Sequence, residues 1–152
     1  MKDVLLKITG TITTLNGGKA ADKDVIEFIT EGQIQSRGRS TMIVYPEMEE
    51  SGMEGATTRI TISPSRVRVK RELAPEVETV MEFEKGRRYN GYYVTGYGPI
   101  PMEVLTNDII MTDDDALGKK TLSIDYSMSL KGLTESRNQL DIKVLREIDK
   151  NE

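Results

Sequence analysis

The chain of 152 residues contains no cysteine. That absence excludes disulfides, thiolate catalysis and the usual sulfur-containing zinc sites. Histidine is absent as well, which removes the commonest general base, the Ser-His-Asp arrangement and the imidazole metal ligands. An enzyme made of this chain would have to use carboxylates, lysine, tyrosine or an oxygen-bound metal. We therefore expect a protein that is not an enzyme and that needs no cofactor.

Long apolar runs are also missing. No segment approaches the roughly 18 apolar residues of a membrane span, and the N-terminal apolar run, 4–6, is too short for a signal peptide. We therefore expect a soluble cytoplasmic protein without a membrane partner. The net charge of -4, from 21 basic and 25 acidic residues, gives no global field that would favour nucleic acid. The length is that of a single domain, 1–152.

The clearest pattern lies near the C-terminus. Apolar and polar residues alternate along 122–130, and the alternation resumes in 140–144 after a polar turn. Because successive side chains of a strand point to opposite sides, this pattern predicts an antiparallel hairpin with one apolar face.

Similar short strands are predicted along the rest of the chain, at 4–14, 25–31, 39–45, 56–62, 67–73, 79–84, 88–95, 98–106 and 108–112. We expect a polar loop at 19–23 and a tight turn at Gly32. In the hairpin of 56–62 and 67–73, we expect Ile62 to face Val67, Thr58 to face Arg71, and Arg59 to face Lys70. Ten to twelve short strands joined by hairpin turns indicate an all-β fold, a closed antiparallel up-and-down barrel, because closure removes the exposed edges.

Four segments resemble the YwiB-like family of uncharacterised bacterial proteins. They are YPEMEESGM (45–53), TTRITI (57–62), GYYVTGYGPIPM (91–102) and DYSM (125–128). The resemblance covers nearly the whole chain, and it implies a calycin-like, that is lipocalin-like, β-barrel. It carries over no catalytic, binding or metal-ligating residue, because the family has no known function.

An arginine interrupts one apolar strand face. Arg71 shares the parity of Val67 and Val69, so a barrel would point it inward or to the rim, where its planar fork could hold a ligand carboxylate. Alternatively, its stem packs at the rim while its charged end reaches water. Tyr89, Tyr93 and Met102 fall on an apolar face as well. The four residues form our predicted ligand-binding set for a small apolar or amphipathic molecule, although side chains can also fill such a barrel completely.

A second hypothesis concerns the outer surface. Arg66, Arg68 and Lys70 lie on one face of one strand, with Arg59 as a cross-strand neighbour. This basic strip could bind a polyanion or a protein, or it could be a solvated face balanced by Glu72, Glu82 and Glu84. The acidic loop with Glu47, Glu49, Glu50 and Glu54 is interpreted as solvated, and Asp113 to Asp115 as a surface turn rather than a calcium loop. The oligomeric state stays open.

Overall fold

Strands make up almost all of the structure. The computed structural model describes residues 1–51, 54–75, 77–95, 98–114, 119–131 and 133–149, without the side chains of 50, 95, 113, 114 and 119. The elements are β1 (Lys2–Asn16), β2 (Lys19–Arg37), β3 (Ser40–Pro46), the 3-10 helix η1 (Glu49–Ser51), β4 (Thr57–Ile62), β5 (Val67–Ala74), β6 (Val77–Phe83), β7 (Arg88–Thr95), β8 (Gly98–Asp114), β9 (Lys119–Leu130) and β10 (Thr134–Glu147).

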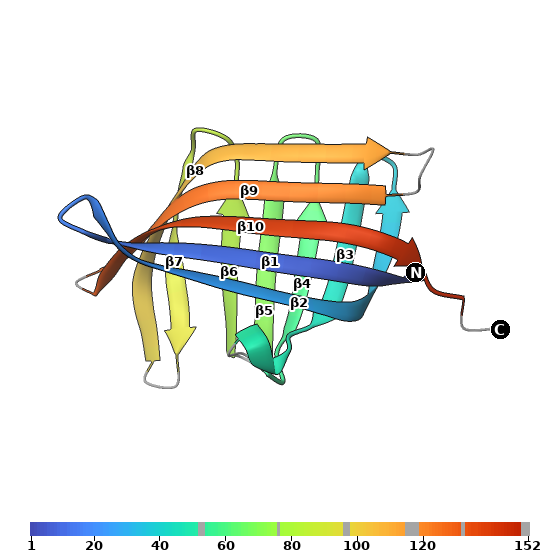
Figure 1. Ribbon diagram of the computed structural model, residues 1–152, viewed down its shortest axis with the longest axis horizontal. Coiled ribbons are helices and arrows are strands. Elements are labelled where there is room, and N and C mark those ends of the chain that lie inside the picture. The colour runs from blue at the N-terminus through green and yellow to red at the C-terminus, as the bar shows by residue number, and fades with distance from the viewer. Residues whose placement is uncertain (52–53, 76, 96–97, 115–118, 132, 150–152) are drawn as a thin grey trace.

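All ten strands belong to one antiparallel sheet in the order β6-β5-β4-β3-β2-β1-β10-β9-β8-β7. Sequence neighbours pair, and the first strand pairs with the last, so the sheet curls into a nearly closed barrel (Figure 1). The ladder is interrupted between β6 and β7, where the amide of Val94 donates to Oγ1 of Thr79 at 3.1 Å. The predicted all-β, antiparallel up-and-down barrel is confirmed, and it is consistent with a calycin-like fold.

The barrel is flattened into two layers. The front layer in Figure 1 consists of β1, β2, β9, β10 and most of β8. The strands β3 to β7 lie behind it and cross the front strands at a large angle. A bulge at Asn107 in β8 shifts the register with β9 between Thr106 and Asp108. Bulges bend a strand and increase its twist. This bulge makes one long bent strand of the segments 98–106 and 108–112, which the sequence predicted as two.

The core lies between the layers and follows the alternation in the sequence. Leu122 faces Ile142 across the β9–β10 pair, and Ile124 faces Leu140, as expected for a hairpin with an apolar inner face. The predicted β4–β5 register is confirmed at all three pairs. Fully buried side chains from eight strands include Leu6, Tyr45, Ile60, Val67, Val69, Met81, Phe83, Val104, Ile124 and Ile142.

Two predicted irregular segments are regular strand instead. Residues 19–23 begin β2 and pair with the end of β1 around the turn Gly17–Gly18, whose φ angles are 61° and 81°. They are polar because both faces of the ribbon are exposed there. Gly32 lies within β2 rather than in a turn. A Cβ at this position would meet Cδ1 of Leu6 at 2.6 Å and the carbonyl oxygen of Val44 at 2.7 Å, so close approach explains this glycine.

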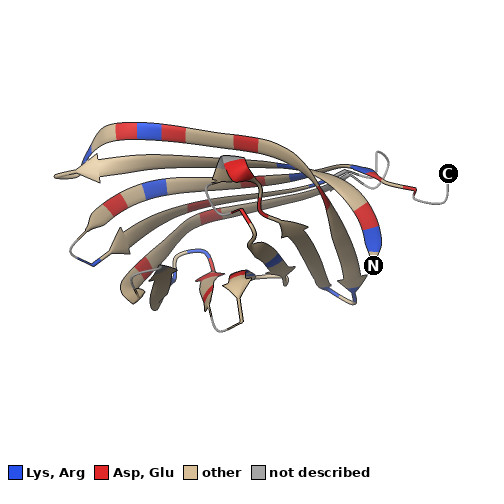
Figure 2. Ribbon diagram, turned by 90° about the horizontal axis from the view of Figure 1, so that it is seen from below, with Lys and Arg blue, Asp and Glu red and all other residues tan. Residues whose placement is uncertain are grey.

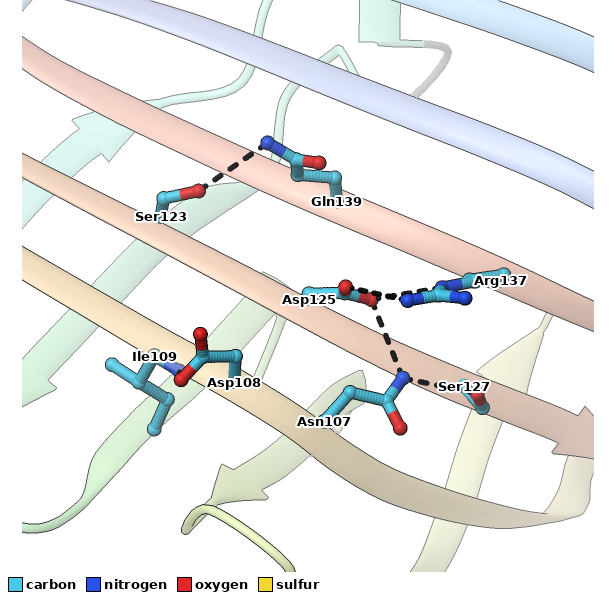
Figure 3. A network of polar contacts seen from close by, with 8 residues as sticks. All are labelled: Asn107, Asp108, Ile109, Ser123, Asp125, Ser127, Arg137 and Gln139. Atoms are coloured by element: carbon cyan, nitrogen blue, oxygen red, sulfur yellow. Dashed lines mark hydrogen bonds and ion pairs between the residues drawn. The ribbon is translucent and has the colours of Figure 1, made fainter.

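A polar network covers the outer face of β8, β9 and β10 (Figure 3). Arg137 donates from Nε and Nη2 to the two carboxylate oxygens of Asp125, at 3.2 and 2.9 Å. The amide of Asn107, the bulge residue, donates to Oδ1 of Asp125 at 3.3 Å and to Oγ of Ser127 at 3.2 Å. These hydrogen bonds, above all those from Arg137, hold the pKa of Asp125 below its usual value.

Replacing Asp125 should therefore lower stability in a pH-dependent way. Asp125→Asn should reduce the free energy of unfolding at neutral pH by about 0.5–1 kcal/mol, a small value because Arg137 is largely exposed. Since the folded pKa is depressed, the stabilisation exists above the unfolded pKa of about 3.9 and is lost as pH falls through the folded pKa. Urea unfolding of both proteins across this range measures it, with the exposed Asp24→Asn as control. A difference that stays constant down to low pH would contradict this assignment.

Candidate functional site

A cavity of about 280 Å³ lies between the two layers of the barrel. Its wall takes side chains from both layers, and apolar residues such as Ile8, Phe28 and Met81 form much of it. Ser51 of η1 also belongs to the wall, and η1 lies across the space between the layers when the barrel is seen from below (Figure 2). The remaining described lining residues are Gly10, Thr11, Ile12, Ile26, Tyr45, Glu47, Arg71, Tyr93, Tyr126, Met128, Asn138, Gln139 and Leu140.

Two charged side chains meet in this wall. Arg71 comes from β5, and Glu47 directly follows β3. Nε of Arg71 lies 3.7 Å from Oε1 of Glu47, and the exposed fractions of the two side chains are 19% and 2%. The separation suits an ion pair but is too long for a hydrogen bond. Among the described lining residues, only these two carry a charge, so the cavity wall is neutral overall.

Hydroxyl groups surround the ion pair. Thr58, opposite Arg71 on β4, donates from Oγ1 to Oε1 of Glu47 at 2.5 Å. Tyr45 is buried beside them, and burial, followed by the charge of Glu47, raises the pKa of its hydroxyl. That hydroxyl therefore stays protonated at neutral pH and can donate a hydrogen bond.

Some polar atoms of this region are left without a partner. Within the described residues, Nε of Arg71 and the hydroxyl oxygen of Tyr45 are buried and make no hydrogen bond. Buried polar groups normally find partners, because leaving one unsatisfied costs about 1–3 kcal/mol. Both atoms have almost no accessible surface, so a molecule inside the cavity reaches them only if the side chains of Arg71 and Tyr45 turn toward it.

The structure brings together half of the predicted ligand-binding set. Arg71 points into the barrel, as one of the two interpretations expected, and Tyr93 joins it in the cavity wall. Met102 is buried in the core, and the ring of Tyr89 covers the position where Gly91 would carry a Cβ; neither belongs to the cavity wall. Tyr126 and Met128, which belong to the apolar face of the predicted strand 122–130, also line the cavity.

Glu47 was assigned wrongly from the sequence. We interpreted it as solvated because it lies among other acidic residues. In the structure Glu47 continues the inward parity of Ile43 and Tyr45. That parity was the available signal, since the chain stays extended at Glu47, whose amide still donates to the carbonyl oxygen of Ala56 at 2.8 Å. Asn138 was missed as well; it lines the cavity and donates to Oγ of Ser136 at 3.0 Å.

The basic strip lies on the outer face and is largely paired. Three of its four cations have a glutamate of β6 or of the turn that follows it as a partner: Arg66 with Glu84 at 3.4 Å, Arg68 with Glu82 at 4.0 Å, and Lys70 with Glu78 at 3.1 Å. The remaining cation, Arg59, donates from Nη1 to the sulfur of Met42 at 3.7 Å. Two of the glutamates that we expected to balance the strip therefore do so, and Glu78 joins them.

The described side chains include no group of three or more acidic residues placed to hold a metal ion. Within the same residues, no helix is long and apolar enough to cross a membrane.

Comparison with known proteins gives the family of the chain. Residues 7–142 match a family model described as a domain of unknown function, DUF1934. The chain belongs to the DUF1934 family. Its fold is similar to that in the crystal structure of the ywiB protein from Bacillus subtilis, with a TM-score of 0.69 and 19% sequence identity over 95% of this chain and 94% of that one. The predicted relation to YwiB-like proteins is thus confirmed. No curated protein sequence matches the chain significantly.

Proposed function

We propose that this DUF1934 chain binds a small amphipathic molecule inside its barrel and does not change it chemically. The observation that carries the proposal is the buried Arg71–Glu47 pair with an unsatisfied donor, set in the wall of an otherwise largely apolar cavity. Ligand sites typically combine an apolar wall with a few convergent polar groups. The apolar part of the ligand would lie against Phe28 and Met81, and its polar end against Arg71.

The size of the cavity limits the ligand. A water molecule in the liquid occupies about 30 Å³, so 280 Å³ has room for a ligand of roughly ten non-hydrogen atoms. Long-chain lipids and nucleotides are larger than that. A small molecule of about this size with one polar group fits best.

A non-enzymatic role in the cytoplasm is part of the proposal. The only charged pair among the described residues of the wall is Arg71 with Glu47. The hydroxyl beside the Glu47 carboxylate belongs to Thr58, which is completely buried and so cannot attack a substrate. The sequence provides no cysteine or histidine to supply a nucleophile or a base.

The alternative proposal, a polyanion- or protein-binding module, would use the strip of Arg59, Arg66, Arg68 and Lys70. This alternative is supported by the exposure of these cations on one face of the barrel. An anion would have to displace three glutamate partners there. We therefore prefer the cavity, where donors are unsatisfied.

Filling the cavity tests the proposal. A Cβ at Gly10 would have no neighbour within 4 Å, and this residue lines the cavity, so Gly10→Leu should occupy the space without disturbing the fold. Native mass spectrometry of protein purified without denaturation should show a copurifying small molecule in the wild type and none in Gly10→Leu. Thr9→Leu introduces the same side chain at the residue before Gly10 in β1, and this variant should still carry the small molecule. A wild-type protein that carries no small molecule, or an equal load in Gly10→Leu, would contradict the proposal.

A further inference from the structure

The charges in the cavity wall narrow the class of ligand. The inference rests on the proposed function and concerns the same site. Arg71 by itself would favour an anionic ligand such as a carboxylate, because a guanidinium matches carboxylate geometry. However, Glu47 lies beside it, within ion-pair distance and almost completely buried. The charge of the arginine is therefore already balanced before a ligand enters.

We propose that the ligand presents an uncharged polar group, such as a carboxamide, and not a carboxylate. A carboxylate entering the cavity would lose its hydration, which is costly for an ion. The attraction of Arg71 would be offset by repulsion from Glu47, which is held in place by the hydrogen bond from Thr58 at 2.5 Å. A neutral group loses less hydration and meets no repulsion.

The hydrogen-bonding groups of the wall match such a ligand. A carboxamide oxygen would accept from the guanidinium of Arg71, whose side chain is 19% exposed, or from the hydroxyl of Tyr45 once that side chain turns toward the cavity. Nε of Arg71 and the hydroxyl of Tyr45 have no hydrogen-bond partner among the described residues. A carboxamide nitrogen donates, and the carboxylate of Glu47 is the strongest acceptor of the wall. A carboxylate ligand has no proton to donate to Glu47 and would leave that pairing unmade.

Two probes of equal length and size test this inference: octanamide and octanoate, each with about ten non-hydrogen atoms, which suits the estimated capacity. Isothermal titration calorimetry at neutral pH should show octanamide binding to the wild type at least about tenfold more tightly than octanoate, because only the carboxylate must bury a new charge. Octanoate binding more tightly than octanamide would overturn the inference while leaving cavity binding intact. If neither probe binds, the proposed function fails together with the inference.

Removing the negative charge of the pair should change the preference for octanamide over octanoate. Glu47→Gln keeps an acceptor for Thr58 and leaves Arg71 unbalanced, so octanoate should gain affinity over octanamide. Glu49→Gln, on the exposed side of η1, is the matched control and should keep the wild-type order. Since Glu47→Gln could fold poorly, the double variant Glu47→Gln with Arg71→Gln provides a second neutral cavity, which should still prefer octanamide. An unchanged preference in Glu47→Gln, or a preference for octanoate in the double variant, would overturn the inference.

Discussion

Glu47→Ala is expected to destabilise the protein by about 2–4 kcal/mol, measured as the free energy of unfolding in urea. The substitution leaves the charge of Arg71 in the barrel without its partner, and removing one member of a buried ion pair is far more costly than replacing both. The value lies somewhat below that for a completely buried pair, because 19% of the Arg71 side chain is exposed.

Two further variants separate the charge effect from a general loss of packing. Glu49→Ala removes an exposed carboxylate two residues away and should change stability by no more than about 0.5 kcal/mol. Replacing the pair together, Glu47→Leu with Arg71→Met, should recover most of the stability lost in Glu47→Ala, because no unpaired charge remains. A double variant that is as unstable as the sum of its single substitutions would show that the two charges do not interact.

Gly32→Ala should cost about 2–3 kcal/mol, since overpacking a close contact forces neighbouring groups to shift. The new Cβ would meet the backbone carbonyl oxygen of Val44 at 2.7 Å, and a backbone atom within a paired strand cannot move easily. The clash with Cδ1 of Leu6 at 2.6 Å is less costly, because a side-chain end can turn away.

Gly10→Ala provides the matched control within the same barrel wall. Its Cβ would meet no atom within 4 Å, so the substitution should be neutral or should stabilise the protein by about 0.4–1 kcal/mol through the reduced freedom of the unfolded chain. Thermal unfolding of both variants measures the contrast. Equal melting temperatures would mean that β2 and β3 do not approach each other closely at Gly32.

The features that depend on residues close together along the chain could be predicted from the sequence. The hairpin of β4 and β5 was placed in the correct register, Thr58 opposite Arg71, because a tight turn and two alternating strands leave little choice of pairing. Arg71 was noticed for the same reason, since it breaks an otherwise apolar parity. The all-β barrel followed from the number of such strands and from their short connections.

The cavity could not be predicted to the same extent because distant strands form it. Glu47 follows β3, whereas Tyr126 and Asn138 come from β9 and β10, and no pattern within one strand shows which of these residues share a level of the barrel. Tyr89 and Met102 have the correct parity but lie at another level. Gly32 shows a related limit, because a glycine needed for close packing and a glycine needed for a turn look alike in a sequence.

The most direct test of a ligand site inside the barrel is a heteronuclear NMR titration with octanamide that follows the Nε–Hε resonances of the arginines. The resonance of Arg71 should shift with increasing octanamide until it saturates, because the residue lines the cavity and its Nε has no hydrogen-bond partner that would hold it in place. The resonances of Arg66 and Arg68, on the outer strip and already paired with glutamates, should stay in place. An unmoved Arg71 resonance, or equal shifts at all three arginines, would contradict a binding site at Arg71 inside the barrel.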